Sequence, residues 1–192
     1  MKRISVLFVA LVMLLAACGT KEDVKKAEGT KEVSEEAVKK ETKVDGYTLK
    51  EPQEDTKCAA CDMKVYQKDH NHGKYSAQAI GEDGKNYFFD DLFCLLNYER
   101  KSGKKMKARF VRDHNSLEWI NVDKANFVKG DIKTPMNVGI ASFKTEKEAK
   151  VFADKFEAEI EKLSSVDKKA MMRFMEKQKE MKKGNKAQEH EM

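Results

Sequence analysis

The residues with the clearest capacity for chemistry stand in one hexapeptide, Cys58-Ala-Ala-Cys61-Asp-Met63. A C-x-x-C pair can cycle as a redox dithiol, bind a metal or close a short disulfide. Covalent haem is excluded, because it needs a histidine directly after the second cysteine and Asp62 stands there. A thioredoxin-like pair needs the motif at a turn from strand to helix, whereas this one precedes strand-like sequence. A disulfide here would close so short a loop that it would stabilise the fold little.

Met63 adds a second kind of sulfur two residues after Cys61. In an extended segment, side chains at i and i+2 lie on the same face, so the two sulfurs would converge on one point. A thiolate together with a thioether is a soft donor set, which selects Cu(I) over hard cations. Two such ligands leave room for a third and suit a site that passes its metal on. The sequence therefore favours a Cu(I) site here.

A structural zinc site is an alternative that the sequence leaves open. Such a site needs four ligands, usually cysteine and histidine. The chain offers them as Cys58, Cys61, Cys94 and one of His70, His72 or His114. The histidines have plainer interpretations, because the first two lie in a polar loop and the third ends a strand. The third cysteine, which precedes two leucines, is typical of a small buried hydrophobe.

The elements that would position these residues begin at about residue 57. Alternating or aromatic runs predict strands at 64–66, 75–80, 86–89 and 108–111. A helix is predicted after the third of these strands, because Asp90 or Asp91 would cap its start and Ser102-Gly103 would end it. Both aspartates are therefore interpreted as caps rather than as acids.

The second half repeats this order. Strands are predicted at 119–122, 125–128 and 139–143. The capping box Thr145-Glu-Lys-Glu148 then opens a helix whose apolar stripe continues to Leu163. The fold class is α+β, with two small sheets that each carry a helix. We expect one domain over residues 57–163, divided at about 57–114 and 115–163.

The first eighteen residues are typical of an export signal. A basic start is followed by an apolar run of about 14 residues, which is shorter than the roughly 20 that a membrane span needs. Leu15-Ala-Ala-Cys18 resembles a bacterial lipobox. That resemblance implies cleavage of the signal peptide 1–17 and lipid on Cys18, and several acyl chains anchor a protein firmly. We therefore expect an extracytoplasmic protein anchored to a bacterial membrane.

Charge is high but evenly mixed. The 192 residues contain 38 Lys and Arg against 33 Asp and Glu, and the charged share of 37% exceeds the roughly 25% of an average domain. Like charges are not concentrated on one segment, so the sequence predicts no nucleic-acid partner.

Residues 18–56 alternate Lys and Glu around isolated apolar residues, and this composition predicts a disordered tether.

The last segment, residues 164–192, is predicted to be a basic amphipathic helical tail. Five methionine and phenylalanine residues recur at helical spacing among seven Lys and Arg residues between 168 and 183. Such a helix can cover the core, or bind a membrane surface or a partner. A methionine relay for metal is a further alternative, although packing alone explains the spacing.

Four stretches, spread over roughly 100 residues from Cys58 to about Ile160, resemble the NosL family of lipoproteins. They are the motif Cys58-x-x-Cys61-Asp-Met63, the run from Tyr87 to Tyr98, Trp119 with its following strands, and the segment from Thr134 to Phe143. The resemblance implies a fold of two similar ββαβ-type units, related to that of organomercurial lyase. This sequence differs from that fold in one respect, because no strand is evident after the second predicted helix.

The resemblance implies a function without catalysis. Members of the family are Cu(I) chaperones that deliver copper for the copper–sulfide centre of nitrous oxide reductase, together with an ABC-type transporter. The family ligands correspond to Cys61 and Met63, and we expect Met136 as the third, with Cys58 and His72 as further candidates. Asp62 replaces the usual glycine, but aspartate tolerates the left-handed conformation better than most residues do. A thiol oxidoreductase, or a binding module with structural zinc or a disulfide, remains the alternative.

Overall fold

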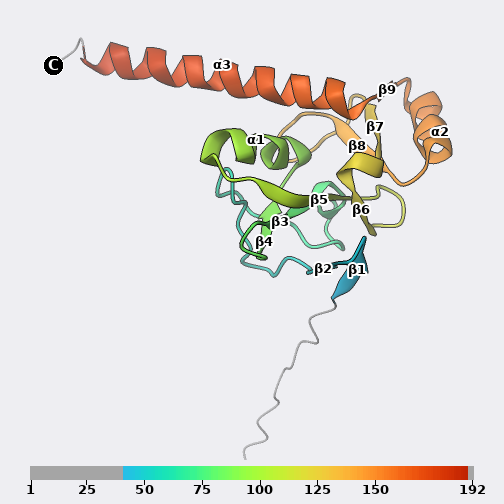
Figure 1. Ribbon diagram of the computed structural model, residues 1–192. Coiled ribbons are helices and arrows are strands. Elements are labelled where there is room, and N and C mark those ends of the chain that lie inside the picture. Colours follow the sequence, from blue (N-terminus) through green and yellow to red (C-terminus); the bar gives the residue numbers. More distant parts are fainter. Residues whose placement is uncertain (1–40, 190–192) are drawn as a thin grey trace, which may run out of the picture. The chain divides into compact units, whose positions relative to one another are not determined.

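The computed structural model describes residues 41–189, and side chains as far as residue 183 (Figure 1). Its first half contains β1 (Thr42–Val44), β2 (Tyr47–Leu49), the short 3-10 helix η1 (Gly73–Tyr75), β3 (Ala77–Gly81), β4 (Asn86–Phe89), α1 (Leu92–Ser102), β5 (Met106–Arg112) and β6 (Trp119–Asn121). Its second half contains η2 (Val122–Lys124), β7 (Asn126–Lys129), β8 (Ile140–Phe143), α2 (Glu146–Phe156), β9 (Glu159–Glu161) and α3 (Leu163–Glu189). This is the mixed helix and sheet architecture that the sequence predicts.

The larger sheet is antiparallel and has the strand order β4-β3-β5-β6. Helix α1 covers its inner face, where Phe89 and Val111 from the strands pack with Leu95 from the helix. The helix starts where the sequence predicts, because Asp91 is extended and its carboxylate accepts the N–H of Phe93 at 2.7 Å. It ends at Gly103, which adopts the left-handed conformation that favours glycine.

The second sheet has the strand order β8-β7-β9 and carries α2. The predicted capping box is confirmed, since Thr145 Oγ1 accepts the N–H of Glu148 at 3.2 Å and the Glu148 carboxylate accepts the N–H of Thr145 at 3.1 Å. The predicted continuation of this helix to residue 163 is wrong. Glu157 adopts a left-handed conformation that ends the helix, and the chain returns as β9 beside β7.

The prediction that no strand follows the second helix is also wrong, because β9 follows α2 and pairs with β7. Both sheets therefore combine the same succession of elements, two strands, a helix and a further strand: β3, β4, α1, β5 and β7, β8, α2, β9. In both, the first of these strands lies in the middle of the three. The end of α2 was not evident from the sequence, because Ile160 continues the apolar spacing of the helix. In the structure this residue lies on β9 and is 50% exposed.

The folded region begins before residue 57, so the predicted extent of the tether is wrong. Strands β1 and β2 form a hairpin around Asp45-Gly46, both with positive φ, as tight two-residue hairpin turns require. Leu49 is completely buried against Phe110 and Trp119. Distant residues of the sheet thus supply the packing that the local sequence lacks. The signal peptide, Cys18 and the tether as far as residue 40 lie outside the described residues.

Residues 64–66 do not form the predicted strand. They contribute a single bridge between Lys57 and Lys64, and Val65 is completely buried. Over residues 41–189, none of the helices combines the length and the apolar composition that crossing a membrane requires.

Helix α3, orange to red in Figure 1, runs alongside α1. Val166 and Ala170 are completely buried in the main core. Two polar contacts fix the helices together: Asn97 Nδ2 donates to the carbonyl of Ala170 at 2.9 Å, and Arg100 binds both carboxylate oxygens of Asp167 at 2.6 Å. The first part of the basic tail therefore covers the core, as one of the alternatives expected.

Candidate metal centre

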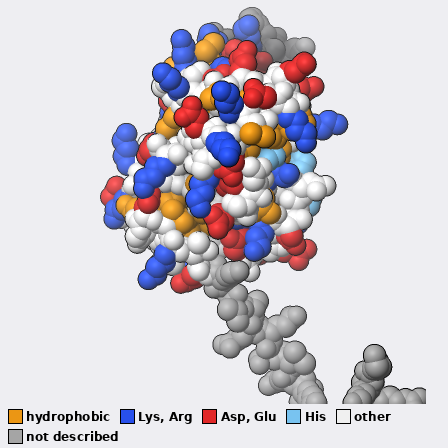
Figure 2. All heavy atoms as spheres, turned by 90° about the vertical axis from the view of Figure 1, so that its right-hand side faces the viewer, with side chains coloured by type: hydrophobic (Ala, Val, Ile, Leu, Met, Phe, Trp, Pro, Cys, Tyr) orange, Lys and Arg blue, Asp and Glu red, His pale blue; other side chains and the backbone are white. Residues whose placement is uncertain are grey.

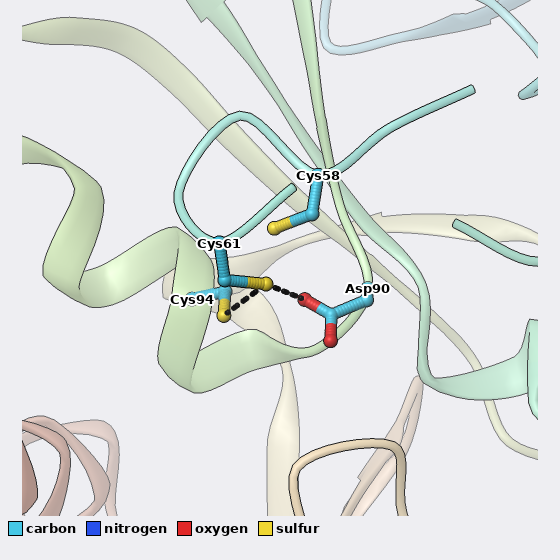
Figure 3. Close-up of side chains that lie close together, drawn as sticks. All are labelled: Cys58, Cys61, Asp90 and Cys94. Carbon is cyan, nitrogen blue, oxygen red and sulfur yellow. Dashed lines mark hydrogen bonds between the residues drawn. The ribbon is translucent and has the colours of Figure 1, made fainter. Parts of the chain in front are cut away.

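Three cysteines and one aspartate meet at one point. The ligand atoms of Cys58, Cys61, Asp90 and Cys94 all lie within 4.8 Å of one another. Figure 3 shows the four side chains directed toward a common centre. Cys61 Sγ lies 3.6 Å from Cys94 Sγ and 3.5 Å from Asp90 Oδ1, and all three cysteines are free thiols. We refer to these four residues as the thiol cluster.

The loop of residues 58–63 holds two of the thiols by backbone hydrogen bonds. The N–H of Cys58 donates to the carbonyl of Met63 at 2.8 Å, and the N–H of Asp62 donates to the carbonyl of Cys58 at 2.9 Å. Ala59 ties the loop to β4 through a 2.9 Å bond to the carbonyl of Phe88. Asp62 has φ of 67°, so the aspartate does adopt the left-handed conformation considered for it from the sequence.

The other two members come from β4 and α1. Asp90 follows the last residue of β4 directly, and Cys94 lies in the first turn of α1. Asp90 is 1% exposed, and its Oδ2 has no hydrogen-bond partner among the described residues. A buried carboxylate oxygen without a partner is costly unless a cation or donor satisfies it. The sequence had suggested only a cap for this aspartate, whereas its neighbour Asp91 is the cap.

The electrostatics of the cluster depend on burial and on the hydrogen bonds between sulfurs. Burial raises the pKa of Cys61 to about 12. The pKa of Cys94 is also raised, because its thiol interacts with the nearby sulfur of Cys58 and is buried. The same interaction lowers the pKa of Cys58. The cluster without a cation therefore retains protons, and a bound metal ion would displace them, as metal binding by thiols requires.

The geometry suits a single metal ion. Metal–sulfur bonds of about 2.3 Å place neighbouring sulfurs roughly 4 Å apart around a shared ion. The 3.6 Å between the sulfurs of Cys61 and Cys94 is close to this value, and the other pairs of ligand atoms lie within 4.8 Å. The set of three sulfurs and one oxygen would accept Cu(I) or Zn(II). The fourth member is an aspartate, so the predicted combination of three cysteines with a histidine is not the one that the structure assembles.

The expected thioether ligands lie in two different settings. Met63 is 47% exposed. Because Asp62 is left-handed, the segment is not extended, and the predicted i, i+2 alignment of Met63 with Cys61 does not apply. Met136 is half-buried against the main core. It lines the same pocket as Cys61 and Cys94, so it lies on the open side of the cluster.

The loop that carries Met136 is held by one threonine. Thr134 Oγ1 accepts the N–H of Val138 at 2.9 Å and of Gly139 at 3.3 Å. Its carbonyl also accepts the N–H of Asn137 at 2.9 Å. Gly139 closes the turn with φ of 63°. A tight turn thus follows Pro135, and it fixes the backbone that precedes β8.

The pocket beside the thiols has a volume of about 230 Å³. It lies between the 58–61 loop, α1, the Met136 loop and α3. Its lining consists of Ala60, Cys61, Phe93, Cys94, Asn97, Lys101, Met136, Arg173, Phe174, Lys177, Gln178 and Met181. Sequence reasoning found the thiols but not the contribution of the tail helix, because only the fold brings α3 over α1.

The histidines form a separate group. Tyr66 stacks on His70 at 4.0 Å between ring centroids, and the N–H of His72 donates to His70 Nδ1 at 3.0 Å. His114 packs against Phe152 at 4.9 Å. No histidine within residues 41–189 belongs to the thiol cluster. His72, a candidate ligand from the sequence, therefore lies in an aromatic group apart from the thiols.

Figure 2 shows the face that carries α2. Histidine and hydrophobic side chains lie next to each other there, and positive and negative side chains are interspersed over the surface.

Burial lowers the pKa of His114 to about 4, so this imidazole is neutral near neutral pH.

Comparison with known proteins places these features in a family. The family model described as NosL matches residues 49–171, which include the thiol cluster, Met63 and Met136. A comparison with curated proteins gives no match. Among solved structures, the chain is similar to the copper chaperone NosL from Shewanella denitrificans, with 18% identity and a TM-score of 0.47 over 57% of this chain and 88% of that one. The chain therefore belongs to the NosL family.

Proposed function

We propose that the chain is an extracytoplasmic Cu(I) chaperone that delivers copper for the copper–sulfide centre of nitrous oxide reductase. One observation supports the metal in particular: the ligand atoms of three free thiols and of the buried Asp90 carboxylate lie within 4.8 Å of one another, and the second oxygen of that carboxylate has no hydrogen-bond partner among the described residues. The copper ion is cargo, so it must enter and leave. The proposed recipient rests on membership of the NosL family.

The donor set favours Cu(I) over other cations. Thiolates are soft ligands, and Cu(I) is the soft ion for which they are selective. The thiols also meet the conditions for exchange, because Cys61 is only half-buried and opens onto a pocket that holds the thioether of Met136. A structural metal site would instead have all of its coordination positions filled by protein ligands.

We assign the ligands in two groups. Cys61 is the central ligand, because its sulfur is close to both Cys94 and Asp90 and it also lines the pocket. Cys58 and Cys94, which are 2% and 7% exposed, form the inner side. Met136, which lines the pocket, is the exchangeable thioether on the outer side, and Met63, which is 47% exposed on the loop that carries Cys61, is a further candidate. Their weaker bonds would let copper pass to a partner by ligand exchange.

We propose that Cys18 carries the lipid that anchors the protein to a bacterial membrane. The lipobox-like sequence and the preceding apolar run support this location. Anchoring would hold the folded domain near an ABC-type transporter that works with the reductase. Membrane fractionation of cells that produce the wild type or Cys18→Ala tests the anchor, since the variant should lose acylation.

The function is tested by anaerobic titration of Cu(I) against a chromogenic Cu(I) chelator. The full chain is used in mild detergent with Cys18→Ser, so that three thiols remain whether or not the leader is removed. We expect one Cu(I) per chain, and at least a tenfold weaker affinity in Cys61→Ser. Met136→Leu and Met63→Leu should weaken binding less. Copper binding that survives loss of Cys61 would contradict the proposed site.

A structural zinc site is the second candidate, and Asp90 is the observation that favours it. Three cysteines and one carboxylate are enough to complete a four-ligand zinc site. Elemental analysis of the protein as purified separates the candidates. One tightly held zinc that Cu(I) does not displace would replace the chaperone proposal by a zinc-stabilised binding module.

A further inference from the structure

The C-terminal helix forms one wall of the pocket that leads to the thiol cluster. Residues Arg173, Phe174, Lys177, Gln178 and Met181 of α3 line the pocket opposite α1. Positions 173 and 174, 177 and 178, and 181 recur at intervals of three or four residues, so these side chains share one face of the helix. The polar contacts that Asn97 and Arg100 of α1 make with α3 hold this wall in position.

Sulfur atoms occur along this pocket at increasing depth. Met181 is 55% exposed on α3, Met136 and Cys61 are half-buried, and Cys94 is 7% exposed at the inner end. Phe93 and Phe174 add apolar surface to the walls of the pocket. A soft cation entering from solvent would therefore meet a thioether first and thiolates last. Thioethers bind Cu(I) through the same softness but more weakly, so each step inward leads to a stronger ligand.

The charges along the pocket suit copper that is already bound to thiolate. A Cu(I) ion held by two or three thiolates carries a net negative charge. Lys101, Arg173 and Lys177 line the pocket and would stabilise that charge in a partly desolvated site. They would also disfavour a free hydrated cation, so copper would have to move along the pocket from one sulfur donor to the next. The lining thus combines soft sulfur donors for the metal with cations for the thiolates that accompany it.

We propose that Met181 of α3 is an additional copper ligand, which receives Cu(I) at the mouth of the pocket and passes it to Met136 and Cys61. This proposal rests on the proposed function, because it concerns the path of the same cargo. It gives the tail helix a kinetic role in loading. Residue 181 also lies beyond the region that the NosL family model matches.

The test compares Met181→Leu with Met175→Leu. Leucine keeps the volume and helix propensity of methionine and removes only the sulfur. Met175 is a matched control, because it lies on the same helix, is 50% exposed and is not among the residues that line the pocket. The full chain with Cys18→Ser is mixed with a Cu(I)–bicinchoninate complex in an anaerobic stopped-flow instrument, and the loss of chelator colour is followed.

We expect Met181→Leu to load copper at least fivefold more slowly than the wild type, while the equilibrium affinity stays within twofold. Met175→Leu should load at the wild-type rate. Equal loading rates in all three proteins would overturn the role of Met181 and leave the chaperone proposal standing. A loss of equilibrium affinity in Met181→Leu would also count against it, because a transient ligand does not set the affinity. If the wild type binds no Cu(I), the proposed function itself fails.

Discussion

Cys61 Sγ lies 3.6 Å from Cys94 Sγ, although the two residues are 33 positions apart in the chain. One sulfur comes from a loop that β4 anchors, and the other from the first turn of α1. Helix α1 begins where Asp91 caps it, so the cap also sets the position of the second thiol. The Asp91 cap, which contains no sulfur, thus helps to place the two thiols side by side.

Replacing Cys94 by alanine should weaken Cu(I) binding about tenfold, which corresponds to about 1.4 kcal/mol. The variant removes one of three thiols and should cost about 1 kcal/mol of folding stability, because a small buried group is lost. Competition with a chromogenic chelator measures the affinity, and urea unfolding confirms that the variant is folded. Met172→Ala, which removes an exposed sulfur from α3, is the control. An unchanged affinity in Cys94→Ala would show that this thiol is only a core residue.

Gly139→Ala should destabilise the protein by about 2 kcal/mol. Gly139 has φ of 63°, and an added Cβ would lie 2.4 Å from the carbonyl oxygen of Gly130, so the backbone must shift. Gly84→Ala is the matched control, because its φ of 74° is equally unfavourable but the Cβ would meet open space. Urea unfolding of both variants measures the difference. Equal losses would mean that the close approach to Gly130 costs nothing.

Glu51→Gln should cost about 3 kcal/mol, because it removes the charge that compensates a buried arginine. Arg112 is 1% exposed, forms an ion pair with Glu51 and stacks on the ring of Trp119 at 3.8 Å. Glu118→Gln removes one partner of an exposed ion pair with Lys144 and should change stability by no more than about 0.5 kcal/mol. Similar midpoints of thermal unfolding for the two variants would contradict this expectation.

His114→Phe should reduce the dependence of stability on pH in the acidic range. Burial depresses the pKa of His114 to about 4, below its ordinary value of 6.5. The unfolded chain therefore binds a proton in this range that the folded protein does not bind. The favourable contribution is present above pH 6.5 and is lost as the pH falls toward 4. Urea unfolding between pH 7 and pH 4.5 should show a smaller fall for the variant than for the wild type.

The control for this experiment is His70→Phe, because His70 is exposed and stacks on Tyr66 at the surface. It should retain the wild-type slope of stability against pH. If His114→Phe keeps the full slope as well, the acid sensitivity arises elsewhere, and the buried imidazole is not its source.

Local signals predicted the starts of both short helices. Asp91 and the Thr145 capping box lie next to the helices they start, so nothing distant is needed to recognise them. The β1–β2 hairpin was missed for the opposite reason, since Leu49 is buried by Phe110 and Trp119, which are about sixty and seventy positions away. Strand β9 was missed because an apolar period of 3.6 continued across a helix end that a single left-handed residue, Glu157, produces.

Some residues of the candidate site were likewise evident from the local sequence, and one was evident only from the fold. The two cysteines of the C-x-x-C motif were evident from their spacing, whereas Cys94 was considered only as a ligand of the alternative zinc site or as a small buried hydrophobe. Asp90 was missed as a member of the site, because a capping role was enough to explain an aspartate before a helix. Its place beside Cys61 depends on tertiary packing between residues 29 positions apart. No local pattern contains that information.

The two segments that supply the thiols would be cross-linked by the cargo itself. An ion held by Cys58, Cys61 and Cys94 closes a loop of more than thirty residues, much as a disulfide restricts the unfolded chain. Binding to the folded state alone adds about 4 kcal/mol to the unfolding free energy at a metal concentration a thousandfold above Kd. The loaded protein should therefore resist proteolysis better than the empty one. Each delivery would return the chain to its more vulnerable form, so that the lifetime of the protein would follow the supply of copper.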